Sequence, residues 1–167
     1  MFSCLELQSR DSTSRIRVAA KENVTGKKYT TQEVSDTVNG LSAGLLKMGI
    51  SRRDHSPEAR DKIAVISKNR PEWLMIDIAV QQIGAVLIPV YPTISINELE
   101  FVLNDASVKI VFVSDQDLFE KVNGIKANLP ALQEIYTFNE IKQVKHWKEI
   151  LSFANDDLIK EVRNISN

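Results

Sequence analysis

The chain has 167 residues, of which 43% are hydrophobic and 26% are charged, and its formal net charge is −1. This composition is typical of one globular domain with a single sizeable core, and the near-zero charge excludes a general attraction to nucleic acid or to an anionic membrane. The only cysteine, Cys4, excludes an intramolecular disulfide, and no apolar stretch reaches the roughly 20 residues that span a bilayer. We therefore expect a cytoplasmic protein.

The sequence pattern divides the chain at about residue 28. Residues 1–28 show no clear period and are predicted to be an irregular or short-strand segment. Residues 29–167 alternate between apolar runs and helical periodicity, and are predicted to form one α/β module. Within this module, Ser51–Lys62 interleaves basic and acidic residues, which indicates a solvated loop rather than a phosphate site.

A first helix is predicted over about Thr31–Met48. Thr30 and Glu33 form a capping-box pattern at its start, and apolar residues then recur at steps of three and four along one face. Gly40 and Gly44 lie four residues apart on this helix. In a polar, soluble helix this spacing predicts close packing against a neighbouring element.

The centre of the chain has the order strand, helix, strand. The apolar runs Ile63–Ile66 and Ala85–Val90 do not alternate with polar residues, as expected of parallel strands that are covered on both faces. Between them, Pro71–Ile83 is predicted to be a crossover helix that Asn69 caps and Gly84 ends. This helix is apolar almost all round, so it is expected to be buried on more than one side.

The same signals predict the rest of the chain. They indicate a helix opened by a capping box of Ser95 and Glu98, a strand at Lys109–Val113, a helix over Asp115–Val122 that Asp115 caps and Gly124 ends, a strand at Glu134–Phe138 and a last helix over about Val144–Val162. The alternation predicts an α/β fold with a mostly parallel sheet and helices on both faces. The first three strands are expected to be adjacent and parallel.

Three strings in the central unit carry a family resemblance: NRPEW from Asn69, QQIGAV from Gln81 and IPVYPTIS from Ile88. They resemble the N-terminal part of the adenylate-forming, AMP-binding acyl-CoA synthetases, and the ending YPTIS is similar to the long-chain fatty acid–CoA ligase branch. The resemblance covers about Tyr29–Asn123. It implies the N-terminal subdomain of that fold, incomplete relative to a parent enzyme that joins a fatty acid to coenzyme A through an acyl-adenylate, using ATP and magnesium.

The resemblance also implies one candidate site. Tyr91, Pro92 and Thr93 follow a predicted strand at its carboxyl end, and in related synthetases this turn lies beside the approach of coenzyme A. Relatives that bind the coenzyme phosphates with arginines place them just after the strand Lys109–Val113, where this chain has Lys121 and no arginine. The alternative is that Tyr91 and Pro92 only shape a rigid turn.

The motifs that carry the parent chemistry are absent from this sequence. No two of the six glycines have a phosphate-loop spacing, and the only Gly-Lys pair, Gly26 with Lys27, is followed by another lysine. We therefore name no catalytic and no metal-binding residue, and expect this chain alone to be inactive and to hold no cofactor. The alternative is a freestanding α/β binding or interaction module; a reading frame that ends near Asn167 would favour it.

The expected partners follow from the same interpretation. The remainder of the synthetase is the first, and self-association through exposed apolar helices is the second, with the central helix or the C-terminal helix around Trp147 at the contact. In the central helix, Asp77, Gln81 and Gln82 form only a narrow polar stripe. Membrane contact is expected to be at most peripheral, and only in the parent enzyme.

Overall fold

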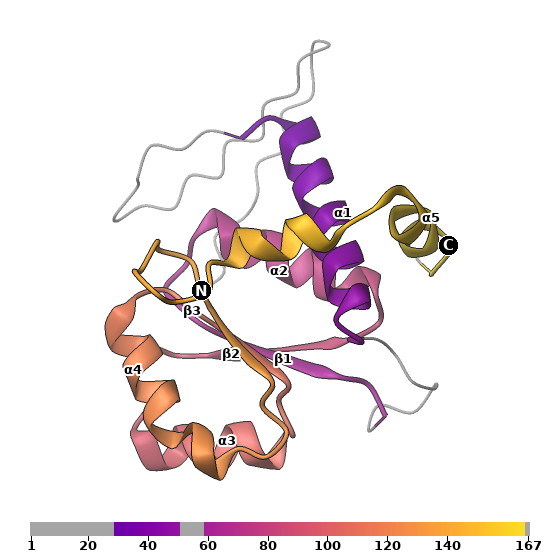
Figure 1. The fold of residues 1–167 in the computed structure, drawn as a ribbon. Coiled ribbons are helices and arrows are strands. Elements are labelled where there is room, and N and C mark those ends of the chain that lie inside the picture. The colour runs from indigo at the N-terminus through magenta and orange to yellow at the C-terminus, as the bar shows by residue number, and fades with distance from the viewer. Residues whose placement is uncertain (1–28, 51–58, 166–167) are drawn as a thin grey trace.

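A computed structural model describes residues 29–50 and 59–165, so the predicted N-terminal segment 1–28 lies outside the described residues. A parallel sheet lies between two layers of helices (Figure 1). The elements are α1 (Thr31–Lys47), β1 (Lys62–Ile66), α2 (Pro71–Gln82), β2 (Val86–Val90), α3 (Ile96–Asp105), β3 (Ile110–Val113), α4 (Gln116–Ile125), β4 (Glu134–Thr137) and α5 (Asp156–Ile165), with 3₁₀ helices η1 (Lys126–Asn128) and η2 (Trp147–Phe153).

The described sheet has four strands in the order β2-β1-β3-β4, and all three pairings are parallel. Ile63 of β1 lies opposite Leu87 of β2 on one side and Ile110 of β3 on the other. The prediction of three adjacent parallel strands is therefore confirmed, with β1 between the other two. The α/β fold class is confirmed as well.

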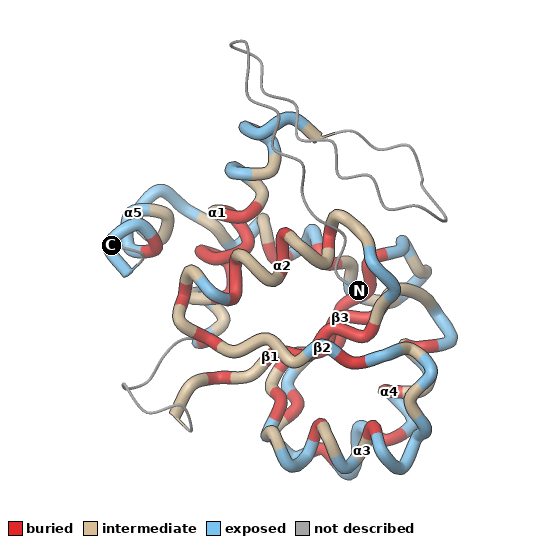
Figure 2. The backbone as a smooth tube through the Cα atoms, turned by 180° about the vertical axis from the view of Figure 1, so that it is seen from behind, coloured by how far each residue is buried: buried red, intermediate tan, exposed pale blue. Residues whose placement is uncertain are grey.

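The two faces of the sheet carry two separate cores, because successive strand residues point to opposite sides. Ile63, Val65 and Phe112 face α1 and α2, whereas Ile66 and Val113 face α3 and α4. Figure 2 shows the buried residues along the strands and on the inner sides of these helices. Helices therefore cover both faces, as predicted.

The predicted start of α1 and the packing of its glycines are both confirmed. The Glu33 N–H donates to Thr30 Oγ1 at 3.1 Å, and the Thr30 N–H donates to Glu33 Oε2 at 2.6 Å. A Cβ placed on Gly44 would lie 2.2 Å from the backbone oxygen of Ile150 in η2. The neighbouring element that the Gly40–Gly44 spacing predicts is therefore η2.

The central helix α2 is covered by α1 within the same chain. Ser42 of α1 donates its hydroxyl to Ala79 O at 3.2 Å and to Gln82 Oε1 at 2.7 Å. Met75 and Ile76 are 2% and 0% exposed. Burial on more than one side is thus confirmed, and α2 offers little apolar surface to another molecule. Self-association of the chain stays a prediction.

Two predictions of helix boundaries were wrong. Asn69 does not cap α2: Arg70 occupies the cap position, and its side chain makes no capping bond. Instead, Arg70 pairs with Glu72 in the first turn. Gly124 does not end α4, because the helix runs to Ile125 and passes directly into η1. Gly84, by contrast, has a φ of 71° and ends α2 as predicted.

The prediction of one C-terminal helix over Val144–Val162 was also wrong. The chain forms η2 first, then turns through Ala154 in an extended conformation, and only then forms α5. Trp147 and Ile150 are buried and three residues apart, which suits the three residues per turn of a 3₁₀ helix. The Leu158 N–H donates to Asn155 Oδ1 at 2.9 Å, so Asn155 caps a new helix.

Candidate functional site at the carboxyl edge of the sheet

The loops after β1 and β3 diverge toward opposite faces of the sheet. The loop after β1 leads to α2 on one face, and the loop after β3 leads to α4 on the other (Figure 1). The Ser114 N–H donates to Ile66 O at 3.2 Å, so the two loops begin side by side. In open parallel sheets, ligands bind at such a divergence, outside the carboxyl ends of the strands.

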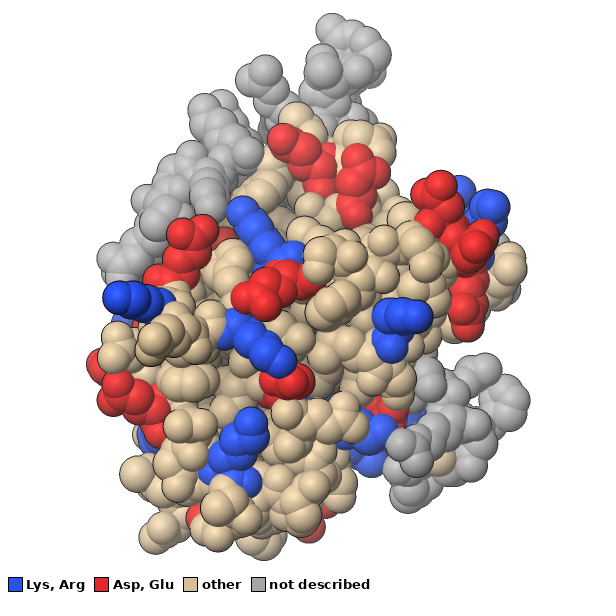
Figure 3. Space-filling model, viewed as in Figure 1, with Lys and Arg blue, Asp and Glu red and all other residues tan. Residues whose placement is uncertain are grey.

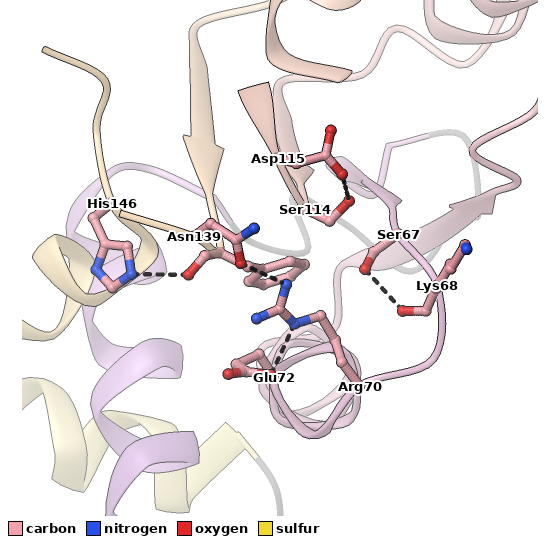
Figure 4. Close-up of polar contacts among 9 residues, drawn as sticks. Ser67, Lys68, Arg70, Glu72, Ser114, Asp115, Asn139 and His146 are labelled. Atoms are coloured by element: carbon pink, nitrogen blue, oxygen red, sulfur yellow. Dashed lines mark hydrogen bonds and ion pairs between the residues drawn. The ribbon is translucent and has the colours of Figure 1, made fainter. Parts of the chain in front are cut away.

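Polar side chains from both loops gather there, and most already have structural tasks (Figure 4). Asp115 Oδ1 accepts from the Leu118 N–H at 3.1 Å, which confirms the predicted cap of α4. Asp115 Oδ2 also accepts from the Ser114 hydroxyl at 2.5 Å. Ser67 donates its hydroxyl to Lys68 O at 2.8 Å, while the Lys68 side chain lies exposed to solvent.

Arg70 connects the end of β1 to the end of β4 (Figure 4). Its Nε donates to Glu72 Oε2 at 2.9 Å, and its Nη1 donates to Asn139 Oδ1 at 3.2 Å. Its guanidinium carbon lies 5.0 Å from the centre of the Phe138 ring, within cation–π range. Burial raises the pKa of Tyr29, and the negative charge of Glu72 raises that pKa further. Arg70 therefore ties two loops together, a role that sequence reasoning missed.

The predicted site residues lie at the end of the edge strand β2. Tyr91 and Thr93 help to line an open groove of about 750 Å³, together with Pro89, Val90, Ile94, Asn97, Glu98, Phe101 and Val102. Pro92 is not among the lining residues. It shapes the turn that the Ile94 N–H closes by donating to Tyr91 O at 3.1 Å. The role of this turn beside a coenzyme stays a prediction.

The local electrostatics offer few free charges for a phosphate group. Lys121, the cation that the sequence places after β3, donates to the backbone oxygen of Ile94. Figure 3 shows acidic and basic side chains interspersed on the visible face.

Within residues 29–50 and 59–165, no group of three or more His, Cys, Asp or Glu side chains could hold a metal ion. No helix in these ranges is long and apolar enough to cross a membrane.

Several relatives of this chain are named as acyl-CoA ligases. The long-chain-fatty-acid–CoA ligase FadD15 of Mycobacterium bovis is 27% identical over 106 residues, which are 64% of this chain and 16% of that protein. The long chain acyl-CoA synthetase 4 of Arabidopsis thaliana is 27% identical over 149 residues, which are 84% of this chain and 21% of that one. This chain thus spans about a fifth or less of the length of these relatives.

Solved structures share the fold. A long-chain-fatty-acid-CoA ligase from Archaeoglobus fulgidus matches 83% of this chain with 26% of its own length, at a TM-score of 0.68 and 17% identity. A red-emitting luciferase from Phrixothrix hirtus matches 79% of this chain with 24% of its own, at a TM-score of 0.67 and 17% identity. At such identities the likeness shows the fold alone. The model of the family described as AMP-binding enzyme matches residues 7–162, and the chain therefore belongs to the AMP-binding enzyme family.

Proposed function

We propose that this chain is the N-terminal portion of a long-chain fatty acid–CoA ligase. The observation that carries the proposal is the set of similar proteins named as a long-chain-fatty-acid–CoA ligase or a long chain acyl-CoA synthetase. The matches to these two names cover 64% and 84% of this chain. The complete enzyme would form an acyl-adenylate from a fatty acid and ATP with magnesium, and then an acyl-CoA. The present portion supplies scaffold and one wall of a groove, and is inactive alone.

The chemistry of the groove supports a limited role in binding. Its lining is mostly apolar, with the Tyr91 and Thr93 hydroxyls and the Asn97 amide as its neutral polar groups. Such a lining suits the uncharged arm of coenzyme A better than its phosphates, which favour Lys and Arg partners. The described residues offer no ligand cluster for magnesium, so we assign no residue to that ion.

Pyrophosphate exchange tests the proposal. The 167-residue chain and the polypeptide encoded by the complete reading frame are each assayed for exchange of pyrophosphate into ATP that depends on a long-chain fatty acid. We expect exchange by the complete polypeptide and none by the chain alone. Exchange by the chain alone would overturn its inactivity, and a complete polypeptide that is inactive with every long-chain fatty acid would overturn the ligase proposal. A frame that ends at Asn167 would favour the freestanding module.

The coenzyme role needs a separate test, because adenylation does not require coenzyme A. In the complete polypeptide, Thr93→Trp would add bulk to the groove wall. We expect thioester formation to fall at least tenfold relative to pyrophosphate exchange. The matched control is Asn123→Trp, at an exposed position of α4 that does not line the groove. Equal effects of the two substitutions on that ratio would show that Thr93 does not lie beside the coenzyme.

A further inference from the structure

The main exposed apolar surface among the described residues lies over β2 and α3. Tyr91, Phe101 and Ile96 are 84%, 69% and 51% exposed, and they are the three most exposed large apolar side chains described. Tyr91 and Phe101 both line the groove. Figure 2 shows exposed residues along α3, on the side away from the sheet. We call Tyr91, Ile96 and Phe101, with the groove between β2 and α3, the α3 face.

The outer edge of β2 is poorly suited to pair with a further strand, so strand pairing does not explain how the α3 face would be covered. The Val86 N–H donates to Asp61 O at 2.9 Å, so Val86 points its backbone groups toward β1. Because the backbone N–H and C=O groups of successive strand residues point to opposite edges of a strand, Leu87 and Pro89 turn theirs toward the outer edge of the described sheet. Pro89 has no N–H to donate, and proline on an edge strand interrupts further pairing. A partner must therefore contact side chains.

The charges around the α3 face disfavour a symmetric pair of copies. Residues 91–108 contain Glu98, Glu100 and Asp105 and no lysine or arginine, so this stretch carries a charge of −3. Lys121 of α4 also lies beside this stretch, where it donates to the backbone oxygen of Ile94. Glu100 accepts a hydrogen bond from Asn128, and Glu98 accepts from Ser95 in the capping box. Glu98 and Asp105 both lie exposed near the two ends of α3 and keep their negative charge there. A two-fold axis through Phe101 would bring Glu98 of one copy close to Asp105 of the other. A partner with basic groups avoids this repulsion.

We infer that the α3 face is the docking surface for the remainder of the synthetase polypeptide. The inference rests on the proposed function, and it places the contact on α3 rather than on α2. The similar ligases and synthetases are several times longer than this chain, which supplies enough polypeptide to cover the face. The docked portion presents apolar side chains to Tyr91 and Phe101 and lysine or arginine to Glu98 and Asp105. It forms the second wall of the groove.

Cysteine labelling of the complete polypeptide tests the inference. Phe101→Cys and Ile96→Cys place single thiols on the α3 face, and Lys126→Cys places the control thiol on exposed η1. All three are made in a Cys4→Ser background. Labelling by a maleimide is followed for each peptide by mass spectrometry, in native buffer and in urea. We expect positions 96 and 101 to react at least tenfold more slowly than position 126 in native buffer, and at equal rates in urea.

The outcomes separate this inference from the proposed function. Equal native rates at positions 101 and 126 would overturn the docking surface, whatever the activity of the polypeptide. A reading frame that ends at Asn167 would overturn it too, because no remainder would exist to dock. Protection without any ligase activity would support the docking surface and count against the ligase proposal, because labelling needs no substrate.

Discussion

Gly44 lies in the tightest surroundings among the glycines Gly40, Gly44, Gly49 and Gly124. An added Cβ would lie 2.2 Å from Ile150 O, a backbone atom that cannot move without η2. We expect Gly44→Ala to lower the free energy of unfolding by about 1–3 kcal/mol, the range for overpacked cores. Urea denaturation followed by circular dichroism measures it. An unchanged midpoint would mean that η2 does not press on α1 in solution.

Gly124 provides the matched control for that substitution. It also lies in a helix, but a Cβ there would meet nothing within 4 Å. Gly124→Ala is expected to raise the free energy of unfolding by about 0.4–1 kcal/mol, because alanine restricts the unfolded chain. The two substitutions add the same methyl group, so opposite signs would isolate the effect of packing from that of helix propensity.

Tyr136 makes the stability of the chain sensitive to alkaline pH. Tyr136 is 2% exposed, and its ring stacks on that of Phe112 with 5.7 Å between the ring centres. Burial raises the pKa of Tyr136 to about 12, and the negative charges of Glu134 and Glu149 add to this rise. An unfolded tyrosine titrates near the ordinary value of 10.0, so the unfolded state loses its proton first. The contribution of the protonated Tyr136 hydroxyl to the free energy of unfolding is therefore fully present below pH 10. It is lost as the pH rises toward 12.

The variant Tyr136→Phe removes this titration. We expect the wild type and the variant to lose stability differently between pH 8 and pH 11, with the larger loss in the wild type. Urea midpoints at the two pH values measure the difference. Equal losses would show that the Tyr136 hydroxyl already titrates as it does in the unfolded chain.

The contacts of single residues differ in how far the sequence predicts them. The spacing of Gly40 and Gly44 is local and predicts close packing without naming the neighbour. Arg70 shows the opposite case. Its contact with Asn139 joins residues that are 69 positions apart, so it depends on the order of the strands. Only the packed sheet brings β1 and β4 close enough for one side chain to reach both loops.

At the scale of elements, two helix starts invite a direct comparison. Asp115 caps α4 through the Leu118 N–H, whereas Asn69 makes no cap at α2. Asp115→Ala is expected to cost about 1 kcal/mol of stability, the usual effect of losing a cap. Asn69→Ala is expected to cost less than about 0.5 kcal/mol, as is usual for exposed positions. Thermal unfolding measures both. Similar costs would mean that Asn69 caps α2 in solution.

The elements that the sequence predicts well are those with strong local signals. Both capping boxes, at Thr30 and at Ser95, form as predicted, because each depends on residues only three apart. The C-terminal helix was predicted wrongly because apolar residues continue at near-helical spacing from Trp147 to Val162. The signal that was overlooked is Asn155 followed by two aspartates, which is a helix start in the middle of that pattern.

At the scale of the whole molecule, the packing is layered outward from the sheet. The helix α2 packs on the sheet, α1 packs on α2, and η2 with α5 packs on α1. The sequence predicts three adjacent parallel strands and the two covered faces, because continuous apolar strands in a βαβ unit leave few alternatives. It does not predict the strand order or the place of β4 at the edge of the described sheet. It does not predict the outermost layer or the α3 face, because these depend on which helix faces remain uncovered after folding.

This layering predicts one cooperative unit that includes the C-terminal segment. Trp147 is 2% exposed, whereas Phe153 in the same 3₁₀ helix is 44% exposed. The Trp147 ring lies edge-on to the Phe138 ring, with 6.4 Å between the ring centres. We expect Trp147→Ala to cost about 3–5 kcal/mol, as is usual for a buried aromatic residue. The control, Phe153→Ala, is expected to cost much less, because nearly half of that residue is already exposed to water.

The Trp147→Ala variant also reports on cooperativity, because Trp73 on α2 is then the only tryptophan. In urea, we expect the fluorescence of Trp73 and the far-ultraviolet circular dichroism to change at the same reduced midpoint, as a two-state transition requires. Loss of the outer layer would then destabilise the sheet as well, because α1 depends on η2 for its cover. A Trp73 transition at the wild-type midpoint, with an earlier loss of helical signal, would contradict this. It would show that the C-terminal segment unfolds independently of the sheet.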